Sequence, residues 1–408
     1  MTTDQQPAST EFLGGFFDNP QINENPFPFF AGLRQTSPVM RMGEANFWIV
    51  TKYDDVVRIL RDHETFSSMV DAASMRGEAR PPTILFDDPP IHTRVRGIIS
   101  KAFTPRTLEA QRPEIERLAR GLIDKMLAKD SADYVAELSY PLPVMVIARM
   151  LGVEEGNMAD FKRWSDAIIQ NIGTALFQDD GLDAIAHIRE EFDAYFRMQI
   201  ERLRAEPRDN LLSALIQARG DDGTDKLSEE DLLMVCRVLL VAGNETTTGL
   251  IVNCARVLAE RPDVLARLRE DIELVPSFIE ETLRYYPPFF ATFRRTKRDA
   301  EVRGVTIPKD HRVLVLLASA NRDEDQFPDA AEFVVDREPN RHVGFGMGIH
   351  YCVGAPLARM ETEIAMRLLI PRITSLTIER AEDDSVLRPG GPESLHVRFQ
   401  RDLAAAPA

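Results

Sequence analysis

One loop in this sequence contains the residue types that hold a metal through sulfur. Residues 345–354 read FGMGIHYCVG, and Cys352 stands just before a predicted helix that Ala355 and Pro356 open. The glycines allow a tight loop that a flat ligand can approach closely. Backbone N–H groups at a helix N-terminus favour a thiolate over a thiol. A thiolate held by loop amides is suited to be an axial ligand of haem iron.

Three other interpretations of this loop are weaker. A lone cysteine is usually a buried structural residue, but such a residue rarely needs a glycine loop around it. A zinc site needs more ligands nearby, and His342 and His350 with one cysteine lack the paired CxxC spacing. A dinucleotide-binding loop requires GxGxxG, whereas Gly344, Gly346 and Gly348 simply alternate.

A second unusual segment lies in the middle of the longest predicted helix. Ser228, followed by three acidic residues, predicts the start of this helix and Pro262 its end, which gives about 32 residues. Its flanks are apolar on nearly all sides, so we expect a buried helix. Residues 242–248 read AGNETTT, which lowers helix propensity, and such a run in a buried helix suggests function. The structural alternative is that the threonines bond to the preceding turn and Glu245 pairs with a core arginine.

Periodicity elsewhere predicts a mainly α-helical chain with small β-sheets, an α+β fold. The predicted helices are 54–61, 91–102, 109–128 and 144–151, and the predicted strands are 38–42, 47–51, 301–306 and 312–317. The polar segment 219–226 is expected to connect two helices. No repeat or long linker divides the chain. We therefore expect one domain over 1–408, with flexible ends at 1–15 and 401–408.

Composition and charge exclude several classes of protein. The chain has 49 Lys+Arg against 65 Asp+Glu, and a net charge of −16 argues against a non-specific binder of nucleic acid or anionic membranes. Cys236, Cys254 and Cys352 are too few for a disulfide framework, and the first two are expected to be core thiols. The N-terminus lacks a basic region, and no run approaches about 20 apolar residues. We expect a soluble, cytoplasmic protein that binds neither nucleic acid nor membrane.

Three motifs in order resemble those of the cytochrome P450 family. The cysteine loop at 345–354 resembles its haem-binding loop, and residues 242–246 resemble the oxygen-activation segment of its long central helix. Glu281-Thr-Leu-Arg284, followed by YYPP, resembles its ExxR helix; ExxR is a weak motif, but this match stands in the family's order. The resemblance extends over nearly the whole chain, to soluble bacterial members. It implies a cytochrome P450-type fold with haem b as cofactor.

The resemblance also implies roles for single residues. Cys352 corresponds to the proximal thiolate, the protein's ligand to the metal, and Glu245 and Thr246 to an acid–alcohol pair that relays protons during activation of dioxygen. Glu281 and Arg284 would form a structural ion pair with Arg337. In the family, a glycine at the position of Gly243 lets the helix open a groove for oxygen. The implied propionate contacts are His92, Arg96, Arg294 (with Arg295 as an adjacent alternative) and His350, and further haem contacts are Ala242, Gly243, Phe345 and Gly354.

The activity implied by the resemblance is insertion of one oxygen atom of O2 into a C–H bond of a hydrophobic small molecule, with electrons from NAD(P)H. The chain has no flavin or nicotinamide fingerprint and too few cysteines for an iron–sulfur cluster, so a separate ferredoxin or flavodoxin with an NAD(P)H-dependent reductase is expected. We predict a basic docking patch on the cysteine side; the alternative is that its arginines are solvated or internally paired. The patch comprises Arg106, Arg112, Arg341 and Arg359.

Substrate class is the least determined feature. Family substrate contacts correspond to segments near 67–85 and 168–187, to the central helix, and to the strand after ExxR, and they are apolar here. Core packing explains any one of them equally well; terpenoids, steroids, polyketides and fatty acids fit this character. The alternatives in function are a peroxide-driven or isomerising haem-thiolate enzyme, and a haem sensor or carrier; Glu245 with Thr246 favours dioxygen chemistry. The residues concerned are Met69, Val70, Ile168, Ile169, Leu176, Phe177, Leu239, Phe289 and Phe290.

Overall fold

The computed structural model describes residues 19–42, 46–71, 74–75, 83–177, 186–220, 223, 225–382, 385 and 391–402. Helices dominate, and the strands are short. The α-helices are α2 (Pro20–Glu24), α3 (Phe27–Thr36), α4 (Tyr53–Arg61), α6 (Ile91–Ala102), α7 (Pro105–Glu109), α8 (Arg112–Leu127), α9 (Pro141–Met150), α10 (Met158–Phe177), α11 (Ala186–Ala205), α12 (Leu211–Gln217), α13 (Glu229–Glu260), α14 (Pro262–Glu270), α15 (Val275–Tyr285), α16 (Leu317–Ala320) and α17 (Ala355–Leu369). The strands are β1 (Val39–Arg41), β2 (Phe47–Val50), β3 (Phe66–Ser67), β4 (Ser131–Asp133), β5 (Thr292–Thr296), β6 (Ala300–Val302), β7 (Val305–Ile307), β8 (Arg312–Val315), β9 (Ile373–Glu382) and β10 (Ser394–Arg401). A π-helical turn, η1 (Val135–Ser139), precedes α9, and a 3-10 turn, η5 (Gly348–His350), lies in the cysteine loop.

The largest sheet has five strands in the order β1-β2-β8-β5-β3, with β2 and β8 parallel. Successive side chains of a strand point to opposite faces. Trp48 and Val50 accordingly pack in one apolar cluster and Phe47 and Ile49 in another. The sheet is therefore buried on both faces. Two smaller sheets, β4-β10-β9 and the β6-β7 hairpin, complete the β-structure.

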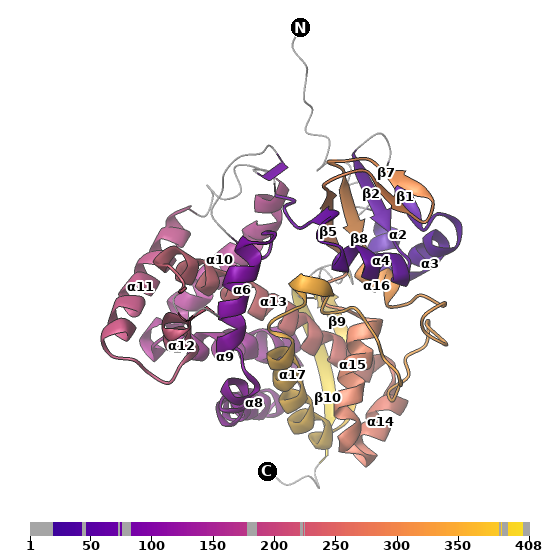
Figure 1. Cartoon of the computed structure of the whole chain (residues 1–408). Helices are drawn as coiled ribbons and strands as arrows, with labels where there is room; N and C mark the ends of the chain where they lie inside the picture. Colours follow the sequence, from indigo (N-terminus) through magenta and orange to yellow (C-terminus); the bar gives the residue numbers. More distant parts are fainter. Residues whose placement is uncertain are drawn as a thin grey trace.

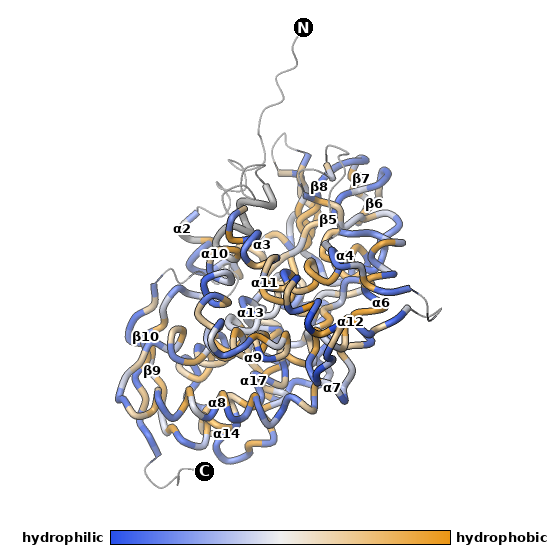
Figure 2. Tube along the Cα trace, turned by 90° about the vertical axis from the view of Figure 1, so that its left-hand side faces the viewer, coloured by the Kyte–Doolittle hydropathy of each residue, from blue (hydrophilic) through white to orange (hydrophobic). Residues whose placement is uncertain are grey.

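The long helix α13 is the axis of the helical part of the molecule. It has 32 residues and packs on α9, α11, α15, α17 and η1. Figure 1 shows α13 between α9–α12 on one side and α15 and α17 on the other, with the five-stranded sheet and α2–α4 beyond them. Its apolar flanks belong to the largest hydrophobic cluster. Hydrophilic residues are frequent along the outer turns in Figure 2, as expected for a chain with a buried apolar core.

The start of α13 has the capping box that the sequence predicts. The Ser228 hydroxyl accepts a hydrogen bond from the Asp231 amide at 3.1 Å, and the Asp231 carboxylate accepts one from the Ser228 amide at 3.0 Å. By length and composition α13 could cross a membrane, but 67% of its most apolar window is buried inside the protein. That burial is typical of a core helix.

Most predicted elements are present, with shifted ends. The helix predicted at 91–102 is α6 with the same bounds, and the strands predicted at 38–42 and 47–51 are β1 and β2. The helix predicted at 109–128 begins later, as α8, because a separate short helix α7 precedes it. The single strand predicted at 301–306 is wrong: the hairpin β6–β7 occupies it. The expected flexible ends lie outside the described residues, except that Arg401 ends β10 and Asp402 follows it.

Candidate functional site

The centre of α13 is less buried than its flanks. Ala242 is exposed, and Thr246, one turn later on the same face, is half-buried. The Thr246 hydroxyl donates to the Ala242 carbonyl at 2.9 Å, which is the bond to the preceding turn that the structural alternative predicts. Glu245 is also half-buried. The acid and the alcohol are therefore consecutive on the helix, and both are partly accessible to solvent.

Gly243 and Asn244 lie where α13 packs against α9 and α10. A Cβ atom at Gly243 would come within 2.8 Å of Ile147 Cδ1, so glycine allows α9 to approach closely. The Asn244 amide donates to the Ser165 hydroxyl of α10 at 3.1 Å. The helix runs unbroken through this region, and the groove expected at Gly243 stays a prediction.

The cysteine loop is held by backbone geometry that only glycine supplies. Gly346 and Gly348 have φ angles of 71° and 72°. A Cβ at Gly348 would lie 2.3 Å from the Leu60 carbonyl oxygen, because the loop rests on the end of α4. The Cys352 amide donates to the Phe345 carbonyl at 3.1 Å, which closes the loop before α17 begins at Ala355.

Burial and the helix N-terminus act in opposite directions on Cys352. Burial is the larger influence and raises the pKa of the thiol, while the Gly354 and Ala355 amides and the Arg96 and Arg359 guanidinium groups lower it. The amides therefore favour the thiolate, as the sequence predicts, but burial outweighs them in the protein by itself. A coordinated metal cation would supply the missing stabilisation, since a ligating thiol is deprotonated.

Four basic side chains gather beside Cys352, and none forms an ion pair among the described residues, although Asp88 is near enough to act on His92 and Arg294. The rings of His92 on α6 and His350 in the loop lie 4.1 Å apart, and Arg294 on β5 is 6% exposed. Within the described chain, Arg96 donates to the Tyr351 carbonyl at 2.6 Å, and Arg294 donates to the Phe293 carbonyl and the Thr292 hydroxyl.

These four side chains have the properties of groups that bind an anionic ligand. Burial lowers the pKa of Arg294 to about 10; burial, then His92, Arg294 and Arg96, lowers that of His350 to about 3. Both ring nitrogens of His92 and Nε2 of His350 are buried without a hydrogen-bond partner among the described residues. Buried polar groups are normally paired. A dianionic ligand such as the two propionates of haem would pair them, so the residues present fit that cofactor.

The alternation of side chains along β5 separates Arg294 from Arg295. Arg294 lies with His350 and Arg96, whose charges act on one another. Arg295 instead donates to the Ser74 carbonyl at 3.2 Å, on the other face of the strand. Arg294 is therefore the arginine placed at the site, which the sequence left open. In the described part of the chain, no cluster of three or more His, Cys, Asp or Glu side chains is arranged to hold a metal ion, so a zinc site is not supported.

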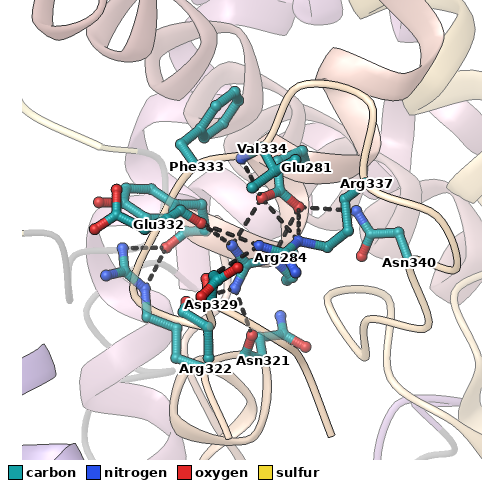
Figure 3. A network of polar contacts seen from close by, with 12 residues as sticks. Glu281, Arg284, Asn321, Arg322, Asp329, Glu332, Phe333, Val334, Arg337 and Asn340 are labelled. Carbon is teal, nitrogen blue, oxygen red and sulfur yellow. Dashed lines mark hydrogen bonds and ion pairs between the residues drawn. The ribbon is translucent and has the colours of Figure 1, made fainter. Parts of the chain in front are cut away.

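The ExxR pair is a buried structural network, as predicted. Glu281 and Arg284 are fully buried and joined by two 2.8 Å hydrogen bonds, and Arg337 Nε lies 3.1 Å from the Glu281 carboxylate. Figure 3 shows Asn340 and the Val334 amide completing the contacts to Glu281, while Arg284 reaches the backbone carbonyls of Asn321 and Glu332. The Glu281 carboxylate and the guanidinium groups of Arg284 and Arg337 are all paired, so the network stabilises the fold behind the loop.

A second charged cluster, which the sequence did not reveal, joins α15, α17 and the cysteine loop. Glu280 accepts two hydrogen bonds from Arg359, at 2.6 and 2.8 Å, and His342 Nε2 lies 3.1 Å from the same carboxylate. The partners are 62 and 79 residues apart in the chain, and no known spacing marks them. Arg359 is thus internally paired, as the alternative to the docking patch predicts.

The other predicted positions fall in three groups. Arg112 pairs with Glu109 on the surface at 2.6 Å, and Arg106 and Arg341 are exposed. Val70 and Leu239 are buried, and Phe289 is 42% exposed. Parts of the segments 67–85 and 168–187 lie outside the described residues, including the side chains of Ile169, Leu176 and Phe177.

Comparison with known proteins gives one consistent result. Residues 7–389 match the family model described as Cytochrome P450. The mycinamicin IV hydroxylase/epoxidase of Micromonospora griseorubida is 40% identical, over 86% of this chain and 88% of that protein. The structure of cytochrome P450 CYP109Q5 from Chondromyces apiculatus has a TM-score of 0.85 at 38% identity, covering 94% of this chain and 98% of that one. CYP109E1 from Bacillus megaterium, solved in complex with testosterone, has a TM-score of 0.83 at 35% identity, covering 92% and 99%.

Proposed function

The chain belongs to the cytochrome P450 family and is a haem-thiolate monooxygenase, and from that premise we propose that it hydroxylates or epoxidises a hydrophobic small molecule with O2 and electrons from a separate protein donor. The observation that carries the proposal is the site itself. Cys352 lies beside four buried or half-buried basic groups that form no ion pair among the described residues, and the centre of α13 contains a half-buried acid and a half-buried alcohol.

We assign the cofactor as haem b, held without covalent attachment to the chain. Covalent c-type attachment needs two cysteines in a CxxCH sequence, and the chain has none. Cys236 and Cys254 are fully buried in α13. Cys352 would ligate the iron through its thiolate, while Arg96, Arg294, His92 and His350 would bind the propionates. Bound haem supplies the activation of O2, and the thiolate donates electron density that favours O–O cleavage.

The chain's own part in the reaction is delivery of protons and placement of the substrate. Glu245 takes protons from solvent and passes them toward the Thr246 hydroxyl. Thr246 Oγ1 is held by its bond to the Ala242 carbonyl, so its position is fixed when the proton is needed. The remaining space beside Ala242 holds the substrate and keeps bulk water away from the reacting carbon.

Electrons come from NAD(P)H through a reductase and a ferredoxin or flavodoxin. The chain has no fingerprint for a flavin or nicotinamide of its own. The docking surface consists of Arg106 and Arg341, which are exposed, with Arg112, whose partner Glu109 is 60% exposed so that water weakens the pair; Arg359 is committed to Glu280, which is 31% exposed. A donor with an acidic face would be attracted to this surface although the whole chain is acidic.

The substrate is a bulky, mostly apolar ring system. The enzyme acts in the cytoplasm. Phe289, which is 42% exposed, provides apolar surface in one of the segments expected to contact substrate, whereas Val70 and Leu239 are buried. One relative is named for hydroxylation and epoxidation of mycinamicin IV, and a structural neighbour binds testosterone. These two chemotypes define the first compounds to test.

A spectral titration tests the proposal directly. A ligand that fits displaces water from the iron and converts ferric haem from low to high spin, which moves the Soret band. Purified protein is titrated with macrolides, steroids, terpenoids and fatty acids. We expect a saturable shift with one ring-containing class. A protein with haem but no shift would contradict the substrate class, and a protein without a thiolate-type haem spectrum would contradict the cofactor site.

A further inference from the structure

Arg359 contacts both ends of the loop that presents Cys352. Its guanidinium lies 4.4 Å from the centre of the Phe345 ring, and its Nη1 donates to the Tyr351 hydroxyl at 3.4 Å. Phe345 begins the loop and Tyr351 immediately precedes Cys352, and the Cys352 amide bonds to the Phe345 carbonyl. One side chain thus spans the segment that must hold the sulfur in place.

Glu280 fixes Arg359 and the start of the same loop together. Its carboxylate accepts both hydrogen bonds of the Arg359 fork, and His342 approaches the second oxygen at 3.1 Å. The other ring nitrogen of His342 accepts a hydrogen bond from the Gly344 amide at 3.1 Å, so His342 links the carboxylate to the backbone just before Phe345. The His342 side chain is 4% exposed, which leaves it little freedom.

The negative charge of the Glu280 carboxylate is strongly stabilised in this cluster. Burial alone raises the pKa of Glu280, but the hydrogen bonds from Arg359 and His342 outweigh it and hold that pKa at about 2. The positive charge of Arg359 is one of the influences that lower the pKa of Cys352. An arginine occupied in this way presents less free charge to a protein donor than an unpaired one.

We propose that Glu280, His342 and Arg359 form a clamp whose role is to position the Cys352 thiolate for the haem iron, and that Arg359 is a positioning residue, not a docking residue. The proposal rests on the haem-thiolate function stated above. Its distinguishing consequence concerns Glu280. If Arg359 served docking, removal of the Glu280 charge would free the arginine and leave the sulfur undisturbed; if the clamp positions the sulfur, the two substitutions have the same effect.

The test compares Arg359→Gln and Glu280→Gln with a matched control on the same helix. Arg367, eight residues further along α17, also forms a forked pair, to Glu273 at 2.9 Å, and its side chain is 29% exposed against 33% for Arg359. For each holoprotein, the ferrous carbon monoxide spectrum gives the fraction with thiolate ligation, and its decay in mild urea gives the persistence of that ligation. Circular dichroism checks that each variant is folded.

We expect Arg359→Gln and Glu280→Gln each to speed the loss of the thiolate-type spectrum by about five-fold or more, since a charge-assisted pair is broken next to the loop. The double variant should be no worse than either single one, and Arg367→Gln should match the unmodified protein. An unchanged spectrum in Arg359→Gln, or an equal loss in Arg367→Gln, would overturn the clamp. If Arg359→Gln does not fold, Arg359→Lys and Tyr351→Phe replace it, with the same order of effects expected and smaller magnitudes. Absence of the thiolate-type spectrum from the unmodified protein would contradict the proposed function, not the clamp.

Discussion

At Thr246, the proposed role in proton delivery can be tested separately from the hydroxyl's structural hydrogen bond. Its hydroxyl bonds the Ala242 carbonyl, and loss of such a bond disturbs a helix only slightly. We therefore expect Thr246→Ala to fold normally and to consume NADH, but to yield product about ten-fold less efficiently per NADH, with the remainder released as peroxide. Paired measurement of NADH, product and peroxide checks this. Thr246→Ser, which keeps the hydroxyl, should remain coupled; full coupling in Thr246→Ala would contradict the proton relay.

The sequence predicted single residues well where spacing fixes them and poorly where only the fold brings them together. The loop motif placed Cys352 correctly before a helix, and His92 and Arg96 were placed on one helix, α6. The choice between Arg294 and Arg295 needed the strand pleat. The Glu280–Arg359 pair was missed because two helices far apart in the chain must first pack side by side.

Among the elements, the cysteine loop depends on the close packing of Gly348 against the Leu60 carbonyl, which a sequence cannot show. Gly348→Ala would combine left-handed backbone, about 1–2 kcal/mol for a non-glycine residue, with a clash against the Leu60 carbonyl. Gly346 has nearly the same φ, but no neighbouring atom lies closer than 4.0 Å to the place that a Cβ would take, so Gly346→Ala should show the conformational cost alone. We expect Gly348→Ala to lower the urea midpoint clearly more than Gly346→Ala and to displace the thiolate spectrum. Equal midpoints would mean that the loop moves away from α4 at no cost.

The helix and strand boundaries that the sequence missed have local causes. Proline lacks an N–H group and is favoured in the first turn of a helix. Pro113 therefore lies in the first turn of α8, and Pro141 and Pro143 in that of α9. The hairpin β6–β7 was missed because its turn uses Arg303 with a positive φ before Gly304, where Asn-Gly is the usual signal. Capping chemistry, in contrast, located the start of α13 correctly.

At the scale of the molecule, the Glu280 cluster should contribute to the acid stability of the fold. The pKa of the Glu280 carboxyl is lowered to about 2 from an ordinary 4.5. The charged carboxylate therefore stabilises the folded state above the unfolded pKa, and this contribution is lost as pH falls toward the folded pKa. We expect Glu280→Gln to show a shallower fall in unfolding free energy between about pH 5 and about pH 3 than the unmodified protein. Urea unfolding at a series of pH values measures it. Glu273→Gln, at a carboxylate whose side chain is 75% exposed, should change this slope much less because water screens the pair.

Charge distribution over the whole surface determines how an electron donor arrives. The chain has a net charge of −16, so an acidic donor is repelled overall and must be attracted by the local surface of Arg106, Arg112 and Arg341. We expect Arg106→Glu together with Arg112→Glu to lower kcat/KM for a ferredoxin about ten-fold at low salt, with the difference shrinking as ionic strength rises. Arg380→Glu together with Arg398→Glu, on β9 and β10, which Figure 2 places on the opposite side of the molecule from α7, is the control matched for net charge. Steady-state reduction rates across a salt series distinguish the outcomes. An equal decrease in the control would mean that net charge alone governs the encounter. A salt-independent decrease would mean that the two arginines act on the fold and not on docking.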